Sequence, residues 1–107
     1  MRNQETNTLN KYLLHFSGAC AMVWRNNTGK FRSLTDPQRI VTVGQVGSAD
    51  IIGVQPVTIT QDMVGKVIGQ AIAIEVKTPT GKQSQEQKNW QQAFEERGGI
   101  YILGRGV

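Results

Sequence analysis

The clearest pattern along the chain is an alternation over residues 70–77, typical of a β-strand because successive side chains point to opposite faces. One face of this predicted strand carries branched apolar side chains, those of Ile72, Ile74 and Val76. The other carries two small and two charged residues, Ala71, Ala73, Glu75 and Lys77. We therefore expect the Glu75 and Lys77 side chains to lie next to each other on one face of a sheet.

An amphipathic helix is predicted over residues 5–17. Its apolar side chains recur at helical spacing and form one face, made of Leu9, Tyr12, Leu13 and Phe16. Glu5 lies four residues before Leu9 on that same face, where carboxylates are usually paired or act as ligands. Glu5 is therefore a candidate acidic ligand, and the alternative is an ordinary surface residue.

A second helix is predicted from Ser84 to about Arg97. Ser84 and Gln87 have the spacing of a capping box, in which each side chain satisfies a backbone amide at the start of the helix. The Gly98-Gly99 pair ends the helix, and a last strand follows over Ile100–Leu103. Gln87 can serve as a cap residue alone or have a second role in a site.

The remaining segments are shorter and predict an α/β plan with one helix before the strands and one among them. Apolar runs predict strands at Ala21–Arg25, Ile40–Val43 and Ile51–Val54. Turn residues fill Asn26–Gly29, and we interpret the basic and polar residues 30–39 as a loop. We interpret residues 55–69 as a ribbon or an irregular connection.

Composition narrows the class of protein. A length of 107 residues fits one domain, residues 1–107, and the net charge of +4 favours a polyanionic partner such as nucleic acid. The single cysteine, Cys20, excludes an intrachain disulfide. The polar first residues do not resemble a signal peptide, and no apolar run is long enough to span a bilayer. We therefore expect a cytoplasmic protein.

Candidate chemistry centres on two carboxylates and one ammonium group. Asp50 begins an apolar strand, and Glu75 and Lys77 share a face of the strongest strand. If these strands pair, the carboxylates repel each other unless a cation joins them, and oxygen ligands suit Mg²⁺ or Mn²⁺. Such a metal activates water and neutralises a phosphate, and a lysine stabilises developing negative charge. These parts suit phosphodiester hydrolysis.

Two short motifs carry a resemblance to known nucleases. Gly47-Ser48-Ala49-Asp50, followed by Ile74-Glu75-Val76-Lys77, resembles the D…E-x-K signature of the PD-(D/E)XK nucleases. With Trp24–Gly29, Gly81-Lys82 and the Ser84–Gln87 helix start, the chain resembles the VRR-NUC family, especially its small stand-alone members from phages and prophages. The resemblance covers nearly the whole chain.

The resemblance implies a fold, an activity and an assembly. The fold is a PD-(D/E)XK (restriction-endonuclease-like) α/β core, with a mixed central sheet flanked by helices. The activity is Mg²⁺- or Mn²⁺-dependent endonuclease cleavage of DNA, selective for branched structures such as four-way junctions. The assembly is a homodimer, whose two-fold symmetry supplies two active sites for the two nicks that a symmetric junction requires.

The resemblance also implies residue roles. Asp50 and Glu75 are metal ligands, the backbone carbonyl of Val76 is a third, and Glu5 completes the metal site. Lys77 is the catalytic lysine, and Gln87 contacts the metal-bound water or the substrate. Contacts to DNA are expected from six further residues, Arg25, Asn26, Lys30, Arg32, Ser48 and Lys82.

Plainer interpretations exist for each residue and for the protein. Asp50 can be a turn residue, and Glu75 with Lys77 a charge pair on a solvated face, although the two small alanines indicate a covered face. The chain can be a catalytically silent DNA-binding module, or a sequence-specific restriction-type endonuclease. Gly99-Ile100-Tyr101 resembles half of the GIY-YIG signature, but only six residues follow Tyr101, too few for the rest of that site.

Overall fold

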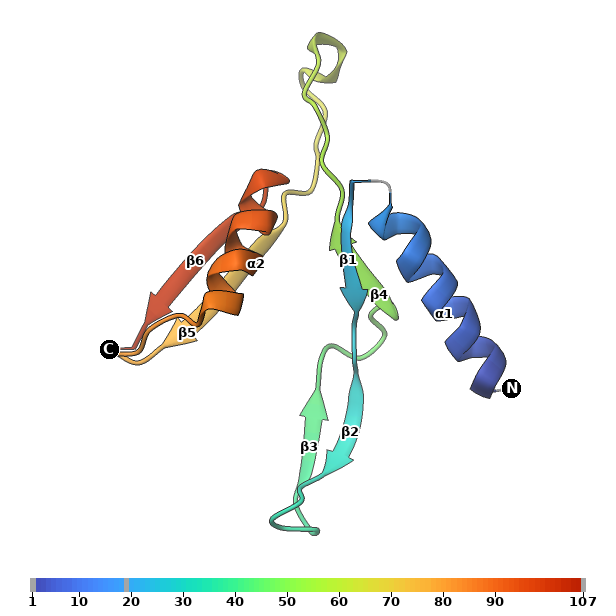
Figure 1. Cartoon of the computed structure of the whole chain (residues 1–107), viewed down its shortest axis with the longest axis vertical. Helices are drawn as coiled ribbons and strands as arrows, with labels where there is room; N and C mark the ends of the chain where they lie inside the picture. Colours follow the sequence, from blue (N-terminus) through green and yellow to red (C-terminus); the bar gives the residue numbers. More distant parts are fainter. Residues whose placement is uncertain (1, 19, 107) are drawn as a thin grey trace. The chain divides into compact units, whose positions relative to one another are not determined.

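The computed structural model describes residues 2–18 and 20–106. In chain order the elements are α1, β1, β2, β3, β4, the short 3-10 helix η1, β5, α2 and β6 (Figure 1). The chain divides into two compact units, the first made of Met1–Ala19 with Val23–Gly53 and the second of Cys20–Met22 with Val54–Val107. Each unit is described by itself.

The first unit contains α1 and two pairs of short strands, except for the end residues Met22 and Val54. The predicted first helix is confirmed as α1 (Arg2–Ser17), which begins three residues earlier than predicted. β1 (Met22–Arg25) is hydrogen-bonded to β4 (Ile51–Val54), and both agree with the predicted strands. These elements bring the start of β4, which follows Asp50, next to the end of β1.

The second strand pair of this unit is a solvent-exposed ribbon. β2 (Gly29–Arg32) pairs antiparallel with β3 (Ile40–Val43), in a register that joins Lys30 to Thr42 and Arg32 to Ile40. The prediction of a loop over residues 30–39 is therefore wrong at its start. Every residue of β2 is exposed, so the strand lacks the alternation of apolar and polar residues by which a half-buried strand is recognised.

The second unit is built around a parallel strand pair. β5 (Ile72–Lys77) pairs with β6 (Ile100–Arg105), with Ala73 opposite Tyr101 and Glu75 opposite Leu103. Parallel neighbours need a crossover connection, which α2 (Gln85–Glu96) provides. In Figure 1, α2 lies across these two strands. Before β5, residues 55–71 contain no strand, and their one regular element is η1 (Gln61–Met63). This agrees with the irregular connection that was predicted for this segment.

The two faces of the β5–β6 pair differ in exposure, as the alternation predicted. One face carries the half-buried side chains of β5 and β6, which are Ala73, Glu75, Lys77, Tyr101 and Leu103. The opposite face carries exposed branched side chains, those of Ile72, Ile74, Val76, Ile100 and Ile102. Phe94 of α2, only 2% exposed, anchors the unit, and its ring stacks on Trp90 with centroids 4.8 Å apart.

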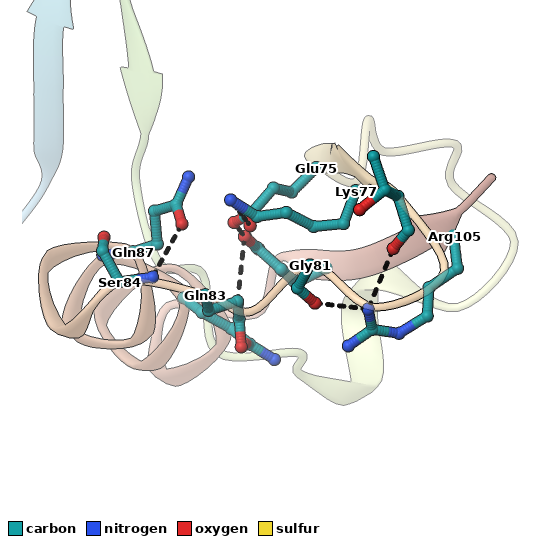
Figure 2. Close-up of polar contacts among 10 residues, drawn as sticks. Glu75, Lys77, Gly81, Gln83, Ser84, Gln87 and Arg105 are labelled. Carbon is teal, nitrogen blue, oxygen red and sulfur yellow. Dashed lines mark hydrogen bonds and ion pairs between the residues drawn. The ribbon is translucent and has the colours of Figure 1, made fainter.

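Local signals in the sequence set both ends of α2. The predicted capping box is confirmed: the Gln87 amide donates to Ser84 Oγ at 3.1 Å, and the Ser84 amide donates to Gln87 Oε1 at 2.9 Å (Figure 2). Gly98 has a φ of 90°, a left-handed conformation that glycine adopts without strain, and it ends the helix as expected. The chain then turns directly into β6.

The chain is thus a mixed α/β protein with small sheets and two helices. Over the residues that the structure describes, its strands form three two-stranded sheets instead of the one central sheet that was expected. Turn residues explain the division within the first unit, because Asn26–Thr28 separate β1 from β2 and Gly44–Asp50 separate β3 from β4. None of the described helices is long and apolar enough to cross a membrane.

Candidate functional site

The Glu75 and Lys77 side chains lie together on the face of β5 that α2 covers. Lys77 Nζ is 3.4 Å from Glu75 Oε2, and the two side chains are only 22% and 14% exposed (Figure 2). The spacing of two residues along one strand produces this pair directly. A charge pair on a fully solvated face is therefore not what the structure contains.

Two further side chains complete this cluster. The Tyr101 hydroxyl, from β6, donates a hydrogen bond to Glu75 Oε1. Gln83, from the loop before α2, donates through Nε2 to the Tyr101 hydroxyl at 3.3 Å and to Gln91 Oε1 at 2.9 Å. We call Glu75, Lys77, Gln83 and Tyr101 the Glu75 cluster.

The hydrogen bonds of the Glu75 cluster change the acidity of its members. The Tyr101 hydroxyl favours the charged carboxylate and lowers the pKa of Glu75 below its usual value of 4.5, against the opposing effect of burial. Hydrogen bonding from Gln83 and the nearby Lys77 ammonium act in the same direction. Burial, followed by the bond to Glu75, raises the pKa of Tyr101. At neutral pH the cluster therefore holds an ionised carboxylate beside a neutral phenol.

One oxygen of Glu75 is buried and accepts no hydrogen bond. Oε1 accepts from Tyr101, whereas Oε2 has the Lys77 ammonium within ion-pair distance but no hydrogen-bond donor. Buried carboxylate oxygens usually have such a donor or a cation. Because Oε2 has no hydrogen-bond donor and only an ammonium at 3.4 Å, its lone pairs can also bind a divalent cation. Within the part of the chain that the structure describes, no three His, Cys, Asp or Glu side chains come together as a ready metal site.

The first unit contains a pocket of about 700 Å³ that brings together two of the predicted acidic ligands. Glu5 lines it from α1, and Asp50 lines it from the start of β4, with Arg25 at the end of β1. Gln4, Thr6, Thr8, Leu9, Tyr12 and Ile51 form the rest of its lining. The helical placement of Glu5 on the apolar face, predicted from its spacing to Leu9, accounts for this arrangement.

Asn26 and Ser48 hold the loop that presents Asp50. Asn26 Nδ2 donates to Ser48 Oγ at 2.9 Å and to the Ala49 carbonyl at 2.8 Å, while the Asn26 amide donates to the Asp50 carbonyl at 2.7 Å. Both residues were predicted to contact DNA. In the structure their side chains are engaged with each other, so their visible role is to fix the backbone beside Asp50.

The other predicted site residues are distributed over both units. The side chain of Val76 is 77% exposed on the opposite face of β5 from Glu75. Gln87 uses Oε1 in the capping box, and Lys82 is exposed in the loop before α2. Lys30 and Arg32 are exposed on the β2 ribbon, where Arg32 Nη1 donates to the Pro37 carbonyl at 2.9 Å.

Sequence reasoning missed Tyr101 and Gln83. Tyr101 was weighed only as part of an unrelated nuclease signature, although a parallel β5–β6 pairing places it on the same face as Glu75. That pairing was the signal that could have identified it, because a strand–helix–strand order predicts parallel neighbours. Gln83 has no comparable signal, since its contact depends on the path of the loop between β5 and α2.

Comparison with known families gives one finding. The sequence model of the VRR-NUC domain matches residues 19–107, which is most of the chain and includes the Glu75 cluster and Asp50. The match begins after α1, so Glu5 lies outside it. No curated protein and no solved structure matches the chain.

Proposed function

Because the chain belongs to the VRR-NUC family of nuclease domains, we propose that it is a metal-dependent endonuclease that hydrolyses phosphodiester bonds in branched DNA, such as four-way junctions. The observation that carries the proposal is the Glu75–Lys77 pair inside the matched region, whose buried carboxylate oxygen accepts no hydrogen bond. A nuclease needs an anionic ligand for a cation and a cationic group for phosphate, and this pair supplies both.

We propose that Mg²⁺ or Mn²⁺ is the cofactor and that Asp50 and Glu75 are its main ligands. The donor chemistry fits, because carboxylate oxygens are the ligands these cations prefer and Glu75 Oε2 lacks a hydrogen-bond donor. The Val76 carbonyl and Glu5 are the proposed additional ligands, and Glu5 is supported by the pocket that it shares with Asp50. The bound cation supplies Lewis acidity and charge neutralisation at the scissile phosphate.

Lys77 is the proposed catalytic lysine. Its ammonium is held in place by Glu75, at 3.4 Å, and its remaining N–H donors can bind a phosphate oxygen or a water molecule. In this role it stabilises the negative charge that grows on the phosphate as the bond to the leaving oxygen lengthens. Gln87 is proposed to contact water or substrate through its amide nitrogen, because its Oε1 is occupied by the Ser84 amide.

Exposed cations are proposed to position the DNA backbone. Arg25 lines the pocket beside Asp50, Lys30 and Arg32 project from the β2 ribbon, and Lys82 lies in the loop before α2. Contacts of this kind position the duplex without reading its sequence and fit a structure-selective enzyme. Asn26 and Ser48 act in this proposal by fixing the loop beside Asp50.

We further propose that the protein acts in the cytoplasm as a homodimer with a PD-(D/E)XK core. Dimerisation is supported by the substrate logic, since cleaving a symmetric junction requires two nicks and a two-fold dimer has two sites. Light scattering coupled to size exclusion tests this point. A mass twice that of the chain is expected, and the mass of one chain would refute the dimer.

The proposed function is tested with a panel of labelled DNA substrates. Purified protein is incubated with four-way junction, flap, single-stranded and linear duplex DNA in Mg²⁺, Mn²⁺ or EDTA. We expect metal-dependent cleavage that is fastest on the junction and absent in EDTA. Binding of DNA without cleavage in either metal would instead indicate a silent DNA-binding module, and cleavage at a single duplex sequence would indicate a restriction-type enzyme.

A further inference from the structure

We propose that Tyr101 is a positioning residue for this reaction: its hydroxyl holds Oε1 of Glu75 so that Oε2 alone is presented to a divalent cation, and Gln83 holds the hydroxyl in place. The proposal rests on the proposed function and deepens it. Nothing in the motifs of the chain assigns Tyr101 or Gln83 to the site. Their roles follow from contacts among four side chains of the second unit.

The register of the parallel strands brings the phenol to the carboxylate. Tyr101 lies opposite Ala73, and Glu75 lies two residues further along β5 on the same face. Because Ala73 ends at its methyl group, it leaves room for the tyrosine ring to reach along the sheet to Glu75. The ring packs under α2, with its centroid 6.1 Å from that of Trp90. The register of the strands and the packing of α2 together therefore direct the Tyr101 hydroxyl toward Glu75.

The direction of the hydrogen bonds is determined by the groups that take part. An ionised carboxylate only accepts, so the shared proton of the Tyr101–Glu75 bond comes from the phenol. Gln83 donates to the phenol oxygen through Nε2, which also donates to Gln91 Oε1. Because Gln83 donates to the phenol oxygen, the phenol O–H is available to donate its hydrogen bond to Glu75. Figure 2 shows Gln83 turned toward Glu75 and Lys77 from the loop before α2.

The consequence is a carboxylate whose Oε1 is occupied by a hydrogen bond and whose Oε2 has only the Lys77 ammonium beside it, at 3.4 Å. Oε1 is bound by Tyr101, whereas Oε2 is buried without a hydrogen bond. Carboxylates that bind metals are commonly held by hydrogen bonds of this type, and loss of such a partner weakens metal binding about 10- to 100-fold. Without the hydroxyl, the Glu75 carboxylate can rotate and share both oxygens with Lys77.

The loop that carries Gln83 is itself held from the end of β6. Arg105 Nη1 donates to the Thr78 carbonyl at 3.2 Å and also to the Gly81 carbonyl (Figure 2). The Gly81 amide donates to the Thr78 carbonyl at 3.1 Å, which closes the turn. The turn before Gln83 is therefore held by hydrogen bonds, which fix the position of Gln83 beside the Tyr101 hydroxyl.

The test measures Mn²⁺ binding by electron paramagnetic resonance on four proteins without DNA. These are the wild type, Tyr101→Phe, Gln83→Ala and the control Gln85→Ala, whose exposed amide donates to Asn89 Oδ1 within α2. Phenylalanine keeps the ring and removes the hydroxyl alone. We expect the Mn²⁺ dissociation constant to rise about tenfold for Tyr101→Phe, less for Gln83→Ala, and not for Gln85→Ala.

Two accompanying measurements separate positioning from structural support. DNA binding by Tyr101→Phe in EDTA should stay close to wild type, and its thermal midpoint should fall only by the modest amount that the loss of one hydrogen bond costs. Junction cleavage should need about tenfold more Mn²⁺ for half-maximal rate, yet recover to near the wild-type rate at saturating Mn²⁺. A purely structural role would lower the rate at every Mn²⁺ concentration, and that result would overturn the proposal.

The outcomes distinguish this inference from the proposed function. If the wild type binds Mn²⁺ and cleaves junctions while Tyr101→Phe matches it in both assays, the positioning role is wrong and the nuclease function stands. If the wild type neither binds Mn²⁺ nor cleaves any substrate, the proposed function fails and the positioning role fails with it.

Discussion

Replacing Gly99 with alanine tests how α2 is packed onto the strands that carry the Glu75 cluster. A β-carbon at Gly99 would lie 2.4 Å from Cε2, 2.6 Å from Cδ2 and 2.9 Å from Cζ of Phe94. Phe94 is 2% exposed and stacked on Trp90, so its ring cannot move aside freely. Alanine at residue 99 therefore forces the helix away from β6 or moves the ring from its position.

The magnitude follows from two opposing effects. Overpacking of a buried site costs about 1–3 kcal/mol. A glycine-to-alanine change also restricts the unfolded chain, which stabilises the protein by about 0.4–1 kcal/mol where the backbone is compatible. The net expectation for Gly99→Ala is a loss of about 1–2 kcal/mol in the free energy of unfolding.

Gly69→Ala is the matched control, because a β-carbon there would have no heavy atom within 4 Å and the backbone is not left-handed. Urea unfolding followed by tryptophan fluorescence measures both variants against the wild type. We expect Gly69→Ala to be neutral or slightly stabilising and Gly99→Ala to be destabilised. Equal stability of the two variants would refute the packing of Phe94 against Gly99.

Three further predictions concern the capping box, the Glu75 cluster and the loop beside Asp50. Ser84→Ala should lower the free energy of unfolding by about 1 kcal/mol in the same assay, because the Gln87 amide loses its acceptor. The Tyr101 hydrogen bond lowers the pKa of Glu75, and this stabilises the folded protein at pH values above about 4.5, the usual pKa. The stabilisation is lost as pH falls through the lowered pKa, so the difference in unfolding free energy between wild type and Tyr101→Phe should close in acid. A difference that is independent of pH would contradict this. Asn26→Ala removes two hydrogen bonds and should cost about 1–2 kcal/mol by urea unfolding, whereas no loss would mean that Asn26 does not hold the loop.

The sequence predicted those parts of the structure that depend on short-range patterns. The alternation over residues 70–77 corresponds to β5, which begins two residues later, at Ile72. The Ser84–Gln87 spacing corresponds to a cap, and the Gly98-Gly99 stop to a helix end. The pairing of Glu75 with Lys77 follows from the same alternation. These features need only the geometry of a single strand or helix, which local sequence determines.

The features that were missed depend on which segments pair. β2 is polar and exposed, so only its pairing with β3 identifies it as a strand. Tyr101 enters the site through the register of β6 against β5, and Gln83 through the path of a loop. Neither register nor loop path is encoded in a local period of the sequence, so these contacts required the structure.

The most direct test of the nuclease assignment compares Lys77→Ala with Lys66→Ala on a labelled four-way junction in Mn²⁺. Lys66 is an exposed lysine outside the Glu75 cluster and serves as the matched control. We predict that Lys77→Ala lowers the cleavage rate about 10²–10³-fold while junction binding persists, and that Lys66→Ala cleaves like the wild type. Cleavage by Lys77→Ala at the wild-type rate would contradict the assignment of the active site to the Glu75 cluster.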